Sequence, residues 1–208
     1  MTQSSWFDFS PSFSSPPIDP ISSSTIVRNA QIEDVSSISE ILTLGFHRFN
    51  DFTFWIYPLY RLSLCAELKG KLQDELAKDK NDRESYCLVA VQISNVNKEI
   101  CQQIVGTVEF SIRRRSSWYN HSKYGYIANL AVNEHCRRQG IASKLLDKCE
   151  QIAQEKNLPN ISLHVLASNE VGQQLYQKNG YDIKEIETDL YSLFVTSKRR
   201  VLMTKNLS

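Results

Sequence analysis

The 208-residue sequence lacks the features that mark membrane-spanning or nucleic-acid-binding chains. No uninterrupted apolar stretch approaches the roughly 20 residues that a helix needs to cross a bilayer. Basic and acidic residues number 24 and 23, a net charge of +1, which gives no reason to expect a nucleic acid or an anionic membrane as the main partner. The composition, 41% hydrophobic and 23% charged, instead predicts a soluble protein with one well-filled globular domain.

The cysteines do not form a recognisable disulfide or metal-binding pattern. They are odd in number, and none forms C-x-x-C or lies near a histidine at zinc-finger spacing: Cys65, Cys87, Cys101, Cys136 and Cys149. We therefore expect reduced thiols in a cytosol-like compartment, and no metal. Cys149 is expected in the core. Cys136 lies beside the glycine loop described below, where a role as nucleophile is the less favoured interpretation.

The N-terminal segment, residues 1–24, is rich in Ser and Pro and contains no Lys or Arg. This composition predicts a disordered tail, followed by a single domain over residues 25–208. A plastid transit peptide would also be rich in Ser, but it should contain arginine and avoid the acidic residues Asp8 and Asp19. We therefore expect a cytoplasmic protein rather than one of the plastid stroma.

Residues 25–84 predict one strand followed by two helices. Thr25–Arg28 forms the strand, and Asp34 is expected to cap the first helix. Between the helices, the aromatic segment 47–58 forms either core or the wall of a binding site. Apolar residues recur at helical spacing in both helices: Val35, Ile38, Ile41, Leu42 and Phe46 in the first, and Leu62, Cys65, Leu68, Leu72 and Leu76 in the second.

Two segments rich in β-branched residues follow, Tyr86–Ile93 and Ile104–Ile112, and predict an antiparallel pair. Arg113, Arg114 and Arg115 are then expected to open a loop that reaches Tyr124. A solvated basic loop is the favoured interpretation of these arginines, over a site for an acidic peptide or a phosphate.

The centre of the chain predicts a strand, a glycine-bearing turn and a helix. Tyr126–Val132 is a short apolar run typical of a buried strand, and the helix extends from the loop Arg137–Ala142 to about Lys156. The first N–H groups of a helix lack intrahelical acceptors, and the helix dipole adds partial positive charge there. The loop is therefore either a pyrophosphate cradle or an ordinary turn with solvated arginines.

The C-terminal part predicts further alternation of strands and helices. Ile161–Leu166 forms a strand, Glu170–Asn179 a helix ended by Gly180, and strands follow near Tyr181–Glu187 and Arg200–Asn206. The chain shows no internal repeat. The resulting order predicts an α/β fold.

Two motifs in the second half of the chain carry a family resemblance. Arg137, Gly140 and Ala142 satisfy [Gln/Arg]-x-x-Gly-x-[Gly/Ala], and residues 169–181 run NEVGQQLYQKNGY. In this order they resemble the signatures of the GNAT superfamily of acetyl-CoA-dependent N-acetyltransferases. That family's second signature has Ala and Phe where this chain has Gly and Tyr. Within the superfamily, the chain is most similar to the bacterial ribosomal-protein N-terminal acetyltransferases and their plastid relatives.

This resemblance implies the GNAT fold, a mixed and largely antiparallel sheet of about six to seven strands flanked by about four helices. It also implies acetyl-CoA as co-substrate, and an acceptor site lined by the segment after the first helix. The resemblance assigns cofactor contacts to the backbone of Leu130, Ala131 and Val132, to the phosphate-binding loop of Arg137, Arg138, Gln139, Gly140, Ile141, Ala142 and Ser143, and to Asn169.

Two side chains are candidates for proton transfer. Tyr176 matches the family's general acid, and a phenol with a pKa of about 10 stays protonated at neutral pH. His164 lies on the strand where the ribosomal-protein enzymes carry a glutamate proposed as base, and a histidine with a pKa near 6.5 can accept a proton at pH 7. Each can instead be structural, and Glu109 on a neighbouring strand is the reserve candidate for the base.

The expected acceptors are protein N-terminal α-amines, with lysine side chains as a further class. Deprotonation at pH 7 costs a lysine roughly 4.6 kcal/mol but an α-amine only about 1 kcal/mol. The alternatives are a small amine such as a polyamine or an antibiotic, and a non-catalytic acyl-CoA-binding sensor. The sequence makes no prediction of oligomeric state.

Overall fold

The computed structural model describes residues 24–46, 57–78, 82–96, 99–117, 120–187 and 199–207. The predicted tail, apart from Ser24, and segment 47–56 of the predicted aromatic wall lie outside these residues. Two short 3-10 helices, η1 and η3, span Ile32–Asp34 and Glu134–Cys136. The other elements are β1 (Ser24–Asn29), α1 (Val35–Phe46), α2 (Tyr57–Leu76), β2 (Ser85–Val96), β3 (Glu99–Ser117), β4 (Asn120–Val132), α3 (Ile141–Glu155), β5 (Asn160–Leu166), α4 (Glu170–Lys178), β6 (Asp182–Glu187) and β7 (Arg200–Asn206).

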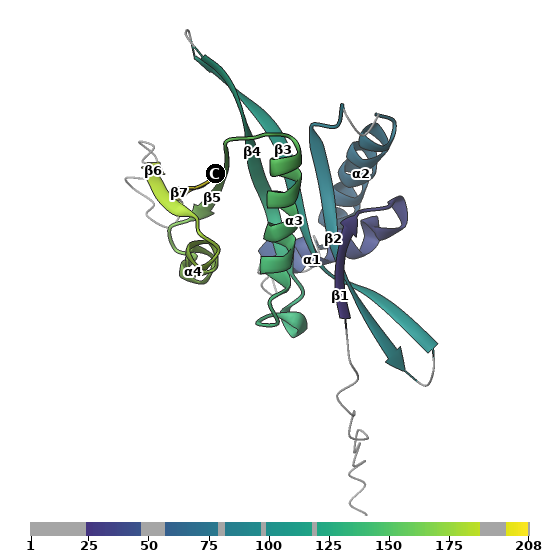
Figure 1. Cartoon of the computed structure of the whole chain (residues 1–208). Coiled ribbons are helices and arrows are strands. Elements are labelled where there is room, and N and C mark those ends of the chain that lie inside the picture. Colours follow the sequence, from purple (N-terminus) through teal and green to yellow (C-terminus); the bar gives the residue numbers. More distant parts are fainter. Residues whose placement is uncertain are drawn as a thin grey trace, which may run out of the picture.

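The strands form one seven-stranded sheet in the order β1-β2-β3-β4-β5-β7-β6. Every neighbouring pair is antiparallel except β4 and β5, which run parallel. Figure 1 shows α3 and α4 in front of the sheet, with α1 and α2 behind it. The predicted α/β architecture and the predicted order of elements are confirmed. Among the described residues, none of the helices combines the length and apolar character required to cross a membrane.

A hydrophobic core fills each side of the sheet. Leu145, Leu146 and Cys149 of α3 are fully buried in the front core, as expected for Cys149. In the rear core, α1 and α2 pack against the opposite face of β2. Alternate residues of a strand point to opposite faces, so neighbouring residues of β2 enter different cores. Leu88 belongs to the front core and Val89 to the rear one.

Gly106 on β3 lets α3 lie close to the sheet. A Cβ at this position would be 3.2 Å from the Ala131 carbonyl oxygen, 3.2 Å from Leu145 Cδ1 and 3.3 Å from Ile141 Cγ2. These distances are tighter than ordinary van der Waals contact, so a larger residue would push α3 outward. Gly106 therefore helps to fix the beginning of α3 against β3 and β4.

The prediction of a loop over residues 113–124 is wrong. β3 continues to Ser117 and β4 begins at Asn120, and the antiparallel ladder runs without a break from Ile112 and Gly125 to the end of the hairpin. Cross-strand contacts between arginines and tyrosines accompany this extension and are described below. The hairpin projects beyond the rest of the sheet (Figure 1).

One smaller prediction about the first helix is also wrong. Asp34 is not the cap of the first helix, because η1 precedes α1, and the Asp34 carboxylate accepts hydrogen bonds from the Gln31 backbone N–H and from the Arg28 guanidinium. Leu62 shares the helical spacing of the buried Leu68 and Leu72, but its side chain is 67% exposed. Leu62 lies one turn from the start of α2, before the helix reaches the rear core.

Candidate active site

β4 and β5 separate from each other halfway along their length. Their parallel ladder joins Gly125–Ile127 to Ile161–Leu163 and goes no further. From Ala128 to Val132, the edge of β4 that faces β5 therefore has no strand partner on that side. Backbone N–H and C=O groups along such an edge can hydrogen-bond an extended ligand inserted between the strands. Leu130, Ala131 and Val132, to which the family resemblance assigns cofactor contacts, all lie on this segment.

A β-bulge occurs on β4 where the strands separate. Thr107 pairs with Ala131 and Glu109 with Ala128, so that two residues of β4 oppose one of β3. Asn129, inside the bulge, has a φ of 52°, a left-handed conformation that asparagine tolerates better than most residues. Its side-chain Nδ2 donates to Glu109 Oε1 at 2.9 Å. The sequence interpretation missed this bulge, because its left-handed residue is an asparagine rather than the glycine that more often marks one.

Glu109 contacts both the β4 bulge and α2. Besides the bond from Asn129, its carboxylate lies 4.0 Å from Lys71 Nζ of α2. A carboxylate with these partners fixes the bulge and carries less uncompensated charge than a lone acid. This environment favours a structural role for Glu109 over the reserve role of general base.

The turn between β4 and α3 presents the open start of a helix. Gly140 is the N-cap residue with a φ of 77°, and no side chain caps the helix among the residues that the structure describes. Arg138 also has a positive φ, 65°. A Cβ added at Gly140 would meet nothing within 4 Å, which leaves the backbone accessible. The N–H groups from Arg138 to Ser143 can therefore bind a phosphate in this turn.

Arginine and lysine side chains add positive charge to this turn. Arg137 is exposed, and its Nε donates to the Val132 carbonyl at 3.2 Å, which ties the loop to the end of β4. Arg138 and Gln139 are exposed beside it. Lys144, in the first turn of α3, reaches the Thr25 carbonyl at 3.4 Å. The structure thus brings the predicted loop residues together next to the unpaired edge of β4.

His164 is the first residue of β5 beyond the part that pairs with β4. Its Nδ1 lies 2.9 Å from the Tyr126 hydroxyl of β4, and the two rings are 5.8 Å apart. When Nδ1–H donates to the Tyr126 oxygen, the lone pair of Nε2 is the proton acceptor of the ring. This hydrogen bond across the two strands was not predicted from the sequence, because it joins residues 38 positions apart.

Tyr176 of α4 packs into the front core beside Tyr181, with ring centroids 6.0 Å apart in an edge-on arrangement. Burial raises the pKa of the Tyr176 phenol to about 12. The phenol therefore remains protonated throughout the neutral and moderately alkaline range, as a hydrogen-bond or proton donor must.

Asn169 is the N-cap of α4. Its Oδ1 accepts a hydrogen bond from the Gly172 backbone N–H at 2.9 Å. A Cβ at Gly172 would lie 2.6 Å from Asn169 Nδ2, so the glycine that replaces the family's alanine makes room for this side chain. The Asn169 oxygen accepts the capping hydrogen bond. The amide NH₂ is then the group that can make the cofactor contact implied by the resemblance.

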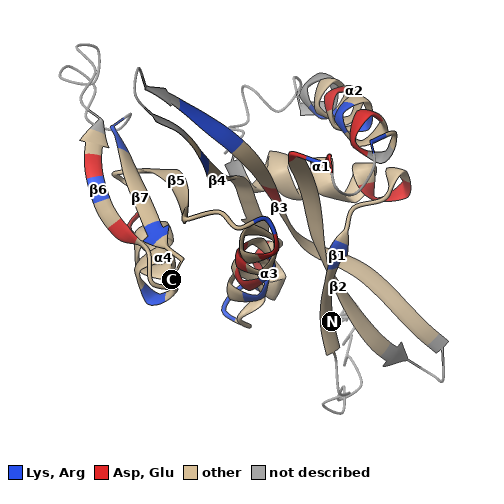
Figure 2. Ribbon diagram, turned by 45° about the horizontal axis from the view of Figure 1, so that its top comes forward, with Lys and Arg blue, Asp and Glu red and all other residues tan. Residues whose placement is uncertain are grey.

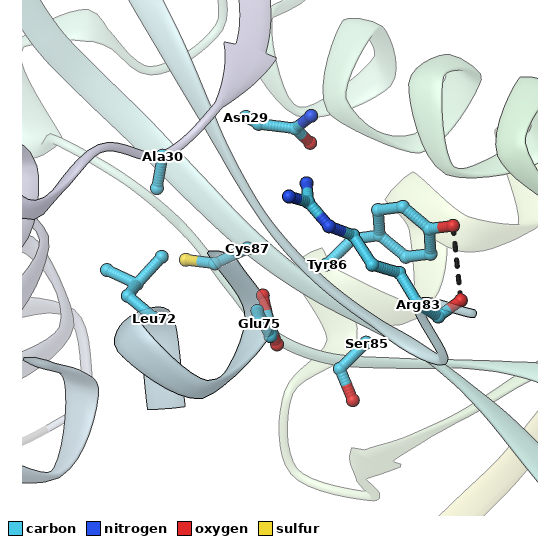
Figure 3. A pocket seen from close by; sticks show the side chains of 8 residues that line it. All are labelled: Asn29, Ala30, Leu72, Glu75, Arg83, Ser85, Tyr86 and Cys87. Atoms are coloured by element: carbon cyan, nitrogen blue, oxygen red, sulfur yellow. Dashed lines mark hydrogen bonds between the residues drawn. The ribbon is translucent and has the colours of Figure 1, made fainter. Parts of the chain in front are cut away.

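The described residues line cavities near the sheet, of which two are considered. One of about 270 Å³ is lined by residues of α1, β3, the end of β4 and the loop that follows it, among them Val132 and Arg137. The other, of about 10 Å³, lies between α2 and β2 and is lined by residues that include Glu75, Arg83 and Cys87 (Figure 3). The first adjoins the loop that follows β4, whereas the second has room for about one water molecule.

Comparisons with known proteins agree with this fold. The family model described as Acetyltransferase (GNAT) family matches residues 50–181. The chain is 28% identical over 185 residues to GCN5-related N-acetyltransferase 10, chloroplastic, of Arabidopsis thaliana, covering 85% of this chain and 69% of that protein.

Two solved structures share the fold at low sequence identity. The PaiA N-acetyltransferase of Thermoplasma acidophilum, in complex with coenzyme A, has a TM-score of 0.59 at 21% identity, covering 88% of this chain and 99% of that one. The NatC complex bound to Gag peptide and CoA has a TM-score of 0.57 at 19% identity, with coverage of 88% and 99%.

The structure thus combines separated parallel strands with an open helix start, an arrangement in which backbone groups can hold an extended ligand and a phosphate. The chain belongs to the acetyltransferase (GNAT) family. It is an acetyl-CoA-dependent N-acetyltransferase that transfers the acetyl group to an amine.

Proposed function

We propose that the protein acetylates the N-terminal α-amines of proteins, with lysine side chains as a second acceptor class, by direct attack in a ternary complex. The observation that carries this proposal is the hydrogen bond between Tyr126 and His164 at the point where β4 and β5 separate. The candidate base, His164, lies directly after the part of β5 that pairs with β4. β5 contains no other titratable side chain.

In this proposal, the backbone of the β4 edge and the turn before α3 hold acetyl-CoA. The edge from Leu130 to Val132 binds the pantetheine arm and polarises the thioester carbonyl through backbone N–H donors. The N–H groups from Arg138 to Ser143 bind the phosphates, with Arg137 supplying additional positive charge. Both sets of groups belong to a rigid framework, because Gly106 allows α3 to pack directly on the sheet.

The acceptor amine attacks the thioester carbonyl carbon, so that a C–N bond forms and the C–S bond breaks. An ammonium acceptor loses two protons on the way to the amide. His164 takes the first, which frees the amine to attack, and Tyr176 gives its proton to the departing thiolate. The second proton leaves the nitrogen as the tetrahedral intermediate collapses, and it replaces the proton that Tyr176 has given up. Burial raises the pKa of the Tyr176 phenol, and it would raise the pKa of a CoA thiol buried beside it in the same way. Because both pKa values shift upward, burial does not oppose proton transfer from the phenol to the thiolate. No covalent acetyl-enzyme is required.

The cost of deprotonation favours α-amines as acceptors. With a single histidine as base, an amine that costs about 1 kcal/mol to deprotonate at pH 7 reacts more readily than one that costs roughly 4.6 kcal/mol. The related NatC structure, which holds a peptide together with CoA, supports a peptide acceptor on this fold. Lysine side chains should react more slowly, because they cost more to deprotonate.

The proposal can be tested by incubating the purified protein with acetyl-CoA and a peptide library that contains free α-amines and internal lysines. Mass spectrometry with fragmentation then locates each acetyl group. We expect acetylation mainly at α-amines, with slower labelling of lysines. A parallel library with blocked N-termini shows the lysine reaction alone.

Intact-mass measurement of the protein with acetyl-CoA alone is the matched control, since direct attack predicts no acetylated enzyme. If no peptide is acetylated while acetyl-CoA still binds, the protein acceptor is excluded. A small amine or a sensor role then takes its place.

A further inference from the structure

Two arginines on the β3–β4 hairpin stack on tyrosines of the opposite strand. The Arg113 guanidinium carbon lies 3.4 Å from the centroid of the Tyr126 ring. That of Arg115 lies 5.4 Å from the centroid of the Tyr124 ring. Both distances lie within the range of a cation–π contact, which is close for Arg113 and looser for Arg115. A contact with the ring face leaves N–H donors of the guanidinium for other partners. We call these four residues the arginine–tyrosine ladder.

The ladder occupies one face of the hairpin, on the side of the sheet that carries α1 and α2. Arg113 pairs with Tyr124 and Arg115 with Ser122, so each guanidinium leans diagonally onto the tyrosine nearer the centre of the sheet. Side chains alternate between faces along a strand. Ile112 and Ile127, the neighbours of the ladder residues, pack into the α3 core on the other face.

Arg114, between the two ladder arginines, provides a contrast. On the opposite face, its guanidinium forms an ion pair with Glu84 at 2.7 Å. Within the described part of the chain, no carboxylate forms an ion pair with Arg113 or Arg115, and both side chains are exposed. Figure 2 shows the resulting blue band on the outer part of β3. The positive charge of the ladder is therefore available to a ligand.

The ladder is continuous with the proposed catalytic base. Tyr126, its inner residue, hydrogen-bonds His164 at 2.9 Å. In the other direction along β4, Tyr124 and Tyr126 are separated from Val132 by six to eight residues, which is roughly 20–26 Å of strand. The phosphate-binding turn follows Val132, so the ladder extends away from it. A phosphate of the cofactor bound in that turn is therefore not the natural partner of these arginines.

We propose that the ladder binds acidic side chains of the acceptor, downstream of the amine that reacts. This inference rests on the proposed function, because it assumes a polypeptide acceptor. The ladder tyrosines are two residues apart, roughly 6.6 Å along the strand, which equals the spacing of alternate side chains in an extended peptide. Carboxylates at alternate positions can thus each meet one guanidinium, whose planar N–H donors match them. The acceptor class is an N-terminal segment with Asp or Glu at alternate positions.

The test compares three peptides of 12 residues with the same first three residues. They carry two Glu, two Gln or two Lys at alternate positions, and the pair is moved along the peptide from residue 4 to residue 9. Initial rates give kcat and KM. We expect the Glu peptide to show a KM roughly tenfold lower than the Gln peptide at one placement, with similar kcat, and this advantage to shrink as salt rises.

Substitution then assigns the preference to the ladder. Arg113→Gln with Arg115→Gln should remove the KM advantage of the Glu peptide over the Gln peptide, whatever its effect on the kcat that the two peptides share. Arg113→Glu with Arg115→Glu should transfer the advantage to the Lys peptide. Arg114→Gln is the matched control, because its partner lies on the opposite face, and it should retain the preference.

The outcomes separate this inference from the function on which it rests. Equal KM values for all three peptides at every placement would overturn the role of the ladder while leaving peptide acetylation intact. A preference that survives Arg113→Gln with Arg115→Gln would overturn it equally. If none of the peptides is acetylated although acetyl-CoA binds, both proposals fail together.

Discussion

At the scale of single residues, Tyr176 is the group whose chemistry is easiest to isolate. Replacement by phenylalanine keeps the packing against Tyr181 and removes only the hydroxyl. We expect Tyr176→Phe to lower kcat by about 10²–10⁴ and to leave the Kd for acetyl-CoA unchanged. Stopped-time acetylation assays and calorimetric titration with acetyl-CoA measure the two quantities separately.

The pKa of Tyr176 adds a second expectation. Since burial raises it to about 12, the phenol should not lose its proton in the usual assay range. The kcat profile of the wild-type enzyme should therefore show no alkaline decline from this group below about pH 11. A variant Tyr176→Phe with full activity would contradict its role as the acid.

His164 and Tyr126 should behave as a base and its positioning partner. We expect His164→Gln to lower kcat/KM for an α-amine peptide by about 10² at pH 7. This defect should shrink above about pH 8, where the α-amine loses its own proton. Tyr126→Phe removes one hydrogen bond, worth about 1 kcal/mol, and should cost only about fivefold.

The pH profiles provide the control for this pair. A His164→Gln defect that is the same at pH 7 and pH 9 would indicate a structural role for the ring rather than proton transfer. Circular dichroism and thermal unfolding of the variant show whether the fold is retained.

The loop before α3 could be predicted from local sequence, whereas the contacts between strands could not. Gly140 and Arg137 lie within a few residues of each other, so their spacing alone indicates a helix start with positive charge. The Tyr126–His164 bond and the Asn129–Glu109 bond instead depend on which strands become neighbours. That information is absent from periodicity, which assigns a residue to a strand but not to a partner.

At the scale of elements, the placement of α3 on the sheet depends on Gly106. We expect Gly106→Ala to destabilise the protein by about 1–3 kcal/mol, because its Cβ would be forced against α3 and the Ala131 carbonyl. Denaturant unfolding measures the change. The affinity for acetyl-CoA should also fall, since the turn before α3 is the one proposed to bind phosphate.

Gly70, in α2, is the matched control for this substitution. A Cβ there would meet nothing within 4 Å, and alanine is the better helix former. Gly70→Ala should therefore stabilise the protein by about 0.5–1 kcal/mol. Equal effects of the two substitutions would show that α3 is not held at the distance described above.

The elements themselves were largely predictable, since apolar periodicity separates strands from helices over most of the chain. The β3–β4 hairpin was the exception, because Arg113–Arg115 lack the apolar alternation of a buried strand. In this part of β3, pairing with β4 and the contact of Arg113 with the Tyr126 ring stabilise the strand. Neither interaction requires the apolar alternation that packing against a core produces.

At the scale of the whole molecule, Glu75 links global stability to pH. Partial burial raises the pKa of this carboxyl, and the nearby Glu109 raises it further, while Arg83 and Lys78 act in the opposite direction. A carboxyl with a raised pKa in the folded state contributes stability below its unfolded pKa. It loses that contribution as the pH rises through the folded value.

Glu75→Gln should therefore increase the free energy of unfolding at pH 7 to 8, because glutamine stays neutral there. The gain should disappear below about pH 4, where Glu75 is protonated in both states. Urea unfolding of both proteins across this range measures the difference. A gain that is constant with pH would exclude titration of Glu75 as its cause.

The preference for α-amines over lysines is the central claim, and one rate ratio tests it most directly. Two peptides of equal length, one with a free α-amine and no lysine, the other with a blocked N-terminus and one lysine, are acetylated separately at pH 7. We predict that kcat/KM for the first exceeds that for the second by up to several hundredfold, and that the ratio falls as the pH approaches 10. A ratio at or below one at pH 7 would contradict the account.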